Sequence, residues 1–136
     1  MSSGTVVRQI MRHIVSIDSK AKAKDAARMM VEKRIGSLVA NREGLPFGIV
    51  TERDLVERIV AQGADPSKVA VAEIMTAPLA TIDASASLID AARRMVEKQV
   101  KRLVVTENDK IIGIISQTDL VQSMTDFEKL AKLGMA

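Results

Sequence analysis

Hydrophobic and polar positions along the chain change period in a fixed order, and the same order occurs twice. In the first half, a short apolar segment at 14–17 predicts a strand, and a stretch with helical spacing follows it. Two further apolar runs, at 38–41 and 47–50, predict strands, and a helix is expected to begin at Asp54. The first half is therefore predicted to form a β-α-β-β-α unit.

The second half repeats these elements. Strands are predicted at 79–82, 103–106 and 111–115, with a final helix expected to begin at Asp119. The apolar face of the helix after the first strand matches between the halves: Ala23, Ala26, Ala27 and Met30 in one, and Leu88, Ala91, Ala92 and Met95 in the other. Turn residues at 42–44 and 107–109 separate the last two strands, and Gly63 is expected to end the first copy's final helix.

An internal duplication explains the repeated order. With an offset of 65, residues 17–56 align with residues 82–121 without a gap, and about 18 of 40 positions are identical. Upstream, 7–11 matches 71–75 at an offset of 64. We predict repeats at 1–66 and 67–136, the second with a C-terminal helical extension whose apolar stripe is Phe127, Leu130 and Leu133. A copy of about 60 residues buries too little surface to be secure alone, so the two copies are expected to pack together.

Composition limits the possible functions. The 136-residue chain has no cysteine, which excludes disulfides and thiolate metal sites, and the one histidine, His13, has no second histidine as a partner. No secretory signal or membrane-length apolar run occurs, so a cytoplasmic protein is expected. The net charge of +3 is spread over interleaved acidic and basic residues, and Tyr and Trp are absent. These features argue against nucleic acid as the main partner.

A short motif ends each copy. Gly48-Ile49-Val50-Thr51-Glu52-Arg53-Asp54 recurs as Gly113-Ile114-Ile115-Ser116-Gln117-Thr118-Asp119. Each version places a hydroxyl and a carboxylate at a helix N-terminus, which suits a ligand with a sugar diol and a phosphate. The alternative is that Asp54 and Asp119 are helix N-caps, since Asp accepts the unpaired amides there. The two roles are compatible, and their occurrence in both copies favours the ligand site.

The two motifs and the β-α-β-β-α duplication resemble the CBS domain, here in the tandem pair called a Bateman module, from about Val6 to Met124. The resemblance implies a mixed α/β (α+β) fold with two repeats packed about a pseudo-twofold axis. It also implies that adenosine derivatives bind in clefts between the repeats. The ligand would be AMP, ADP or ATP, with S-adenosylmethionine and NAD as other possibilities.

The resemblance also assigns roles to individual residues. Asp54 and Asp119 would hold the ribose hydroxyls, and Thr51 and Ser116 would approach ribose or phosphate. The adenine would lie against the first strand of each copy and nearby apolar residues, namely Ile14, Val15, Ile17, Ile35 and Val50, and Leu79, Ala80, Ile82, Val100 and Ile115. Three basic residues are candidates for phosphate, namely Arg53, Lys101 and Arg102. Gly36, Ser37 and Thr118 occupy the matching positions of the other copy, so the two sites are not expected to be equally good. Solvated surface charges are the alternative explanation for these cations.

A non-catalytic sensor that binds adenine nucleotide and modulates a protein partner is the leading hypothesis. A structural or dimerisation scaffold without ligand is the alternative. An enzyme ranks third, because no nucleophile, base and orienting group occur together. A homodimer is also expected, formed by apolar faces of the terminal helices at Leu55, Ile59, Val60, Leu120, Val121 and Met124.

Overall fold

The chain forms two compact units in a computed structural model, which describes residues 4–132 and side chains as far as residue 126. The first-repeat unit is Ile14–Leu79. The second-repeat unit combines the chain up to His13 with the chain from Ala80 onward. The expected apolar stripe of Phe127, Leu130 and Leu133 lies outside the described side chains.

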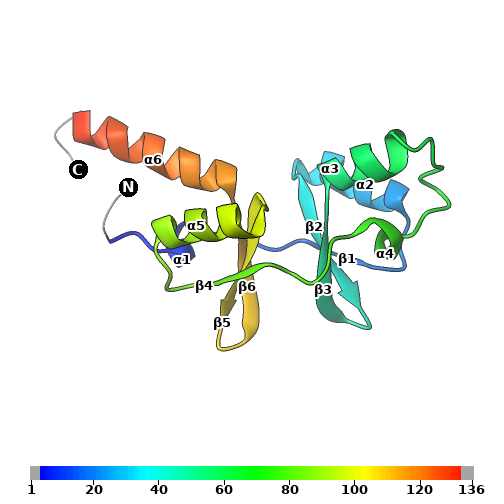
Figure 1. The fold of residues 1–136 in the computed structure, drawn as a ribbon, viewed down its shortest axis with the longest axis horizontal. Helices are drawn as coiled ribbons and strands as arrows, with labels where there is room; N and C mark the ends of the chain where they lie inside the picture. The colour runs from blue at the N-terminus through cyan, green and yellow to red at the C-terminus, as the bar shows by residue number, and fades with distance from the viewer. Residues whose placement is uncertain (1–3, 133–136) are drawn as a thin grey trace. The chain divides into compact units, whose positions relative to one another are not determined.

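The first-repeat unit is a three-stranded sheet packed against helices (Figure 1). Strand β1 (Ser16–Asp18) pairs in parallel with β2 (Ser37–Arg42), which pairs antiparallel with β3 (Leu45–Thr51). The helices are α2 (Ala23–Lys33), α3 (Glu52–Leu55), which continues into the π-helical turn η1 (Val56–Val60), and α4 (Val71–Ile74). The parallel β1–β2 pair follows from the connection through α2, whereas the antiparallel pair needs only a tight turn.

The second-repeat unit repeats this plan. Strand β4 (Thr81–Asp83) is parallel to β5 (Arg102–Glu107), which is antiparallel to β6 (Lys110–Ser116). The helices are α1 (Val7–Ile10), α5 (Leu88–Lys98) and α6 (Gln117–Lys132). Both hairpins turn through two residues with positive φ, Glu43-Gly44 and Asn108-Asp109. Such turns match the twist of the strands that they join.

The segment at the start of each repeat packs in the compact unit of the other repeat. Helix α1 precedes the first repeat in sequence, yet Val7 is fully buried in the core of the second-repeat unit. Helix α4 precedes the second repeat, and Val71 and Ile74 are buried in the core of the first-repeat unit. The predicted repeats 1–66 and 67–136 divide the chain by sequence. The compact units differ from these repeats because the segment at the start of each repeat belongs to the unit of the other repeat.

The two cores contain most of the residues that the helical spacing selected, although Ala27 and Ala92 are only half-buried. Ala23, Ala26 and Met30 are buried beside Leu38 and Val50 in the first-repeat unit. The matching cluster of the second-repeat unit contains Leu88, Ala91, Met95, Leu103 and Ile115. The mixed α/β class and the order of elements predicted from the sequence are confirmed.

Several boundaries and one packing prediction were wrong. The first strand of each copy begins at Ser16 and Thr81, two residues later than expected. The final helices begin at Glu52 and Gln117, two residues before the aspartates. Helices α1 and α4 were not predicted. Ile59 and Leu120 are buried in the cores of their own units, so they are not available to a dimer interface, whereas Val60, Val121 and Met124 are exposed.

Candidate functional site

The first candidate site is built where β3 ends and α3 begins. Thr51 is the N-cap of α3, and its side-chain oxygen accepts a hydrogen bond from the Asp54 amide at 3.3 Å. Oδ2 of Asp54 accepts in return from the Thr51 amide at 2.8 Å and from the Thr51 hydroxyl at 3.1 Å. This reciprocal pair is a capping box, in which Asp54 is the third helical residue. The prediction that Asp54 is itself the N-cap was therefore wrong by three positions, because Thr51 fills that role.

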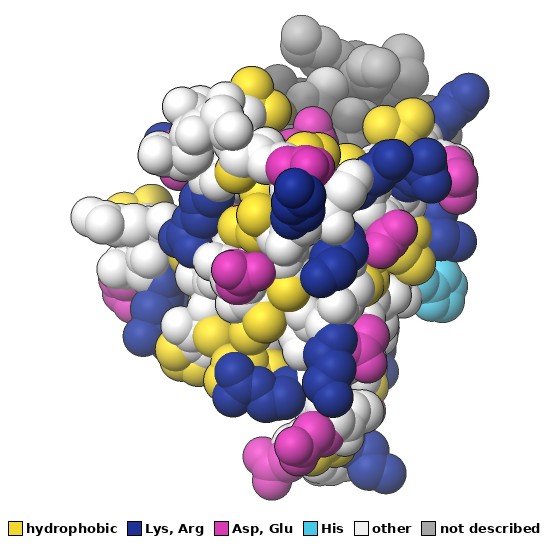
Figure 2. Space-filling model, turned by 90° about the vertical axis from the view of Figure 1, so that its right-hand side faces the viewer, with side chains coloured by type: hydrophobic (Ala, Val, Ile, Leu, Met, Phe, Trp, Pro, Cys, Tyr) yellow, Lys and Arg dark blue, Asp and Glu magenta, His cyan; other side chains and the backbone are white. Residues whose placement is uncertain are grey.

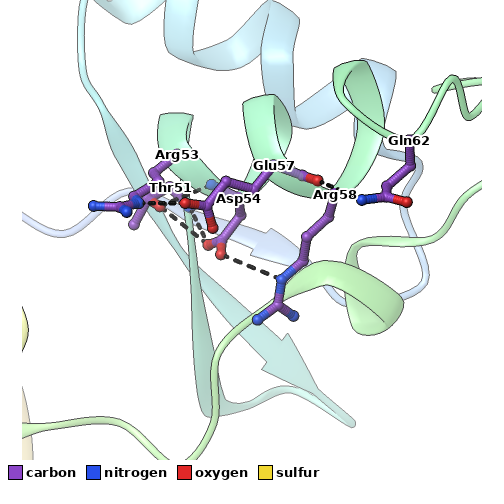
Figure 3. Close-up of polar contacts among 6 residues, drawn as sticks. All are labelled: Thr51, Arg53, Asp54, Glu57, Arg58 and Gln62. Carbon is purple, nitrogen blue, oxygen red and sulfur yellow. Dashed lines mark hydrogen bonds and ion pairs between the residues drawn. The ribbon is translucent and has the colours of Figure 1, made fainter.

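The capping box uses only one oxygen of the Asp54 carboxylate. Within the described part of the chain, Oδ1 accepts no hydrogen bond, and its nearest ionic partner is Nε of Arg58 at 3.9 Å. Figure 3 shows the carboxylate between Thr51 on one side and the Arg58 guanidinium on the other. Asp54 is nevertheless buried, with 7% of its surface exposed. Oδ1 of Asp54 is not fully enclosed, since Asn41 Oδ1 is the only fully buried side-chain polar atom without a hydrogen bond in the described chain, and Oδ1 of Asp54 is therefore free to accept a hydrogen bond from a ligand.

The second candidate site has the same box and an additional partner. The Ser116 amide donates to Oδ2 of Asp119 at 2.9 Å, and the Asp119 amide donates to the Ser116 hydroxyl at 3.1 Å. Oδ1 of Asp119 accepts a hydrogen bond from Nε of Arg12 at 2.7 Å. The hydrogen bond and the charge of Asp119 raise the pKa of Arg12 above its ordinary value. Asp119 is as buried as Asp54, but both of its oxygens are engaged.

The three phosphate candidates have different surroundings. Nε of Arg53 donates to Glu57 Oε1 at 2.6 Å, one helical turn along, and the pair is exposed (Figure 3). Arg102 lies opposite Ser116 in the β5–β6 register, and the Lys101 carbonyl accepts from the Gln117 amide at 2.8 Å. Lys101 and Arg102 therefore flank the second motif, while Arg53 belongs to the other unit. Their convergence on one phosphate stays a prediction.

The residues assigned to an adenine pocket divide by burial. Val50, Ile115 and Ile17 are buried in the cores of their units. The others are half-buried and retain surface for a ligand, namely Ile14, Val15, Ile35, Leu79, Ala80, Ile82 and Val100. The assignment of these residues to an adenine pocket also stays a prediction.

Two arginines at the sites were missed in the sequence. Arg58 follows Asp54 by four residues, so helical spacing alone could have identified it. Arg12 is 107 residues from Asp119 and belongs to the segment lent by the first repeat, for which no local pattern gives a signal.

On the face drawn in Figure 2, basic side chains lie among acidic and hydrophobic ones and form no single block. Among the side chains described as far as residue 126, no group of three or more His, Cys, Asp or Glu could hold a metal ion. No helix in the same part of the chain has the length and apolar character needed to cross a membrane.

These features define a two-repeat α/β module with a capping-box carboxylate at the end of each repeat. Comparison with protein families matches the CBS domain over residues 7–61 and 71–126. The chain belongs to the CBS domain family, as a tandem pair.

Relatives and solved structures agree with this assignment. An uncharacterized protein of Methanopyrus kandleri is 37% identical over 124 residues, covering 90% of this chain and 62% of that protein. The hypoxic response protein 1 of Mycobacterium tuberculosis is 27% identical, covering 90% and 87% of the two chains. A structure of a CBS-domain protein from Burkholderia ambifaria has a TM-score of 0.83 at 35% identity, covering 88% and 93%. A hexameric CBS-CP12 protein from bloom-forming cyanobacteria has a TM-score of 0.83 at 31% identity, covering 91% and 74%.

Some of these relatives are longer than this chain. The chain spans 62% of the Methanopyrus protein and 25% of a CBS domain-containing protein of Arabidopsis thaliana.

Proposed function

We propose that this protein is a non-catalytic regulatory module that binds an adenosine derivative, with AMP, ADP or ATP as the leading ligands, and modulates a protein partner. S-adenosylmethionine and NAD are the other adenosine derivatives to be tested. The observation that carries the proposal is the buried Asp54 carboxylate, whose Oδ1 has no hydrogen bond within the described chain. Asp119 has the same box in the second repeat.

The chemistry of a ribose fits these groups. Its 2′- and 3′-hydroxyls are two neighbouring donors, and an ionised carboxylate only accepts hydrogen bonds. The cap fixes the Asp54 side chain by holding Oδ2, so Oδ1 is presented in one orientation without further ordering cost. Arg58 nearby, and Lys101 and Arg102 beside the second motif, would favour a ligand that also carries phosphate. Adenine nucleotides are plentiful in the cytoplasm, where we propose that the protein acts.

We also propose that the protein self-associates through its helices. Exposed apolar side chains lie on α2, on η1, on α5 and on α6, namely Val31, Val56, Val60, Ile89, Val96, Val121 and Met124. An open apolar hollow of about 390 Å³ on α5 is lined by Ile89, Ala92, Arg93, Val96 and Glu97. Exposed apolar surface of this kind is typical of a protein interface. A homodimer is the simplest assembly that covers it.

A thermal-unfolding panel tests the nucleotide proposal. AMP, ADP, ATP, S-adenosylmethionine, NAD and a guanine nucleotide as control are each added in excess. A ligand at 100 times its dissociation constant should stabilise the protein by about 2.7 kcal/mol. We expect at least one adenine nucleotide to raise the unfolding temperature and the guanine nucleotide to raise it less. A panel in which no nucleotide shifts unfolding contradicts the proposal and favours the ligand-independent scaffold.

A further inference from the structure

The two capping-box sites differ at one structurally matched position. Arg12 and Thr76 are equivalent in the duplication at an offset of 64. Each forms a two-hydrogen-bond bridge to the residue that follows the motif glycine. Arg12 pairs with Ile114 at 2.8 and 3.0 Å, and Thr76 pairs with Ile49 at 2.8 and 2.9 Å. The backbone therefore presents residues 12 and 76 at the same place in the two units.

Only the arginine side chain reaches the aspartate of its own unit. Nε of Arg12 lies 2.7 Å from Oδ1 of Asp119. No hydrogen bond links Thr76 to Asp54 within the described chain, and the Arg58 contact to Asp54, at 3.9 Å, is too long to be one. The oxygen left without a hydrogen bond in the first-repeat unit is thus occupied in the second-repeat unit.

The contact between Arg12 and Asp119 stabilises the carboxylate, but a ligand can displace it. The Asp119 side chain is 6% exposed, so its charge is poorly solvated and benefits from the guanidinium. The Arg12 side chain is 72% exposed, so it can swing into water at little cost, and solvent and salt screen the pair. A ribose hydroxyl would donate to the same atom, Oδ1 of Asp119, that accepts the hydrogen bond from Arg12.

We propose that Arg12 competes with ribose for Asp119, so that the Asp54 site fills first and the Asp119 site binds only when Arg12 moves away. This inference rests on the proposed function and adds that the residues at positions 12 and 76 determine which of the two sites binds ligand first. Arg12 is a specificity-determining residue of the second site. It separates the sites in affinity, which lets one protein respond over a wider range of ligand concentration than two equal sites would.

The experiment exchanges the two matched residues. Arg12→Thr and Thr76→Arg are made singly and together, and each protein is titrated by calorimetry with adenosine, a neutral ligand that isolates the contact with the diol. The wild type should show two unequal sites. Arg12→Thr should tighten the weaker site by about three- to tenfold, and Thr76→Arg should weaken the tighter site by a similar factor. The double exchange should reverse the order of the sites, and Arg12→Lys should lie between threonine and arginine.

The dependence of adenosine affinity on salt concentration provides a second measurement. This dependence would not differ between the wild type and Arg12→Thr if Arg12 had only a structural role. Adenosine carries no charge, so added salt should strengthen its binding to the weaker wild-type site by screening the Arg12–Asp119 pair, and should leave Arg12→Thr unchanged. Unaltered affinities in both single variants overturn the inference, as does weaker adenosine binding in Arg12→Thr, which would mean that Arg12 holds the ligand. If neither adenosine nor AMP binds to any of the proteins, the proposed function itself fails and the inference fails with it.

Discussion

Gly48→Ala tests why each motif begins with a glycine. Gly48 lies in β3, and a Cβ placed there would be 2.8 Å from the Thr76 carbonyl oxygen and 2.9 Å from Sδ of Met75. Both contacts are far closer than van der Waals distance. The carbonyl cannot retreat without disturbing the Ile49–Thr76 bridge, which contributes hydrogen bonds of 2.9 and 2.8 Å. The glycine is therefore required by the segment that follows α4, which packs across the strand.

The expected loss of stability can be bounded in two ways. Forcing an extra carbon into a packed contact costs about 1–3 kcal/mol. If the segment pulls away instead, two hydrogen bonds at about 0.5–1.5 kcal/mol each are lost, which gives the same range. Reduced freedom of the unfolded chain returns about 0.4–1 kcal/mol. We expect a net destabilisation of about 1–2 kcal/mol, or a fall of about 3–7 °C in the unfolding midpoint.

Circular dichroism measures the midpoint, and hydrogen exchange of the Ile49 and Thr76 amides reports the bridge. Gly4→Ala is the control, because its Cβ meets no atom within 4 Å. Gly113→Ala should cost less, because the nearest atom, Sδ of Met11 at 2.6 Å, belongs to a flexible side chain, and the Arg12 carbonyl oxygen is farther away, at 3.1 Å. Unchanged stability and unchanged exchange in Gly48→Ala would refute the steric explanation.

Further substitutions address the cations and the assembly. Arg102→Ala should weaken AMP by about tenfold and leave adenosine unchanged, because only phosphate offers the guanidinium a charge-assisted bond. Arg53→Ala should have a smaller effect, since Arg53 already pairs with Glu57. Calorimetry with AMP and with adenosine measures both variants. An equal loss of affinity for AMP and adenosine in Arg102→Ala would place Arg102 outside the phosphate site. Val60→Glu and Val121→Glu should shift the mass measured by light scattering from dimer to monomer, and Lys68→Glu, at an exposed loop position, is the control. A monomeric wild type at micromolar concentration would contradict the dimer.

Local patterns in the sequence were sufficient for most of the fold. The spacing of Ala26, Met30 and their counterparts selects the buried helix face, and the turn residues at 43–44 and 108–109 separate the hairpin strands. The helix starts were misplaced because both Thr51 and Asp54 are residue types that cap helices. The spacing of a hydroxyl residue and an acid three positions later is itself the capping-box signature, so Thr51 could have been recognised as the cap.

Contacts between distant segments could not be predicted in the same way. Helices α1 and α4 have four residues each, too few for a helical period, and their packing on the other repeat's sheet has no local signature. The Arg12–Asp119 contact depends on that exchange. The environment of Asp119 therefore became visible only in the folded chain.

We propose that the capping-box aspartates hold a ribose as well as a helix end. Calorimetric titration of AMP into the wild type and into the Asp54→Asn/Asp119→Asn double variant separates these two roles. Asparagine keeps an oxygen for the Thr51 and Ser116 amides and loses the favourable charge at the helix N-terminus, a cost of about 0.3–1 kcal/mol per site. The double variant should stay folded, as circular dichroism can check, and AMP should bind it at least about tenfold more weakly, because the amide can turn a donor toward the ribose hydroxyls. Equal AMP affinity in the two proteins would contradict the claim and leave Asp54 and Asp119 as helix-capping residues alone.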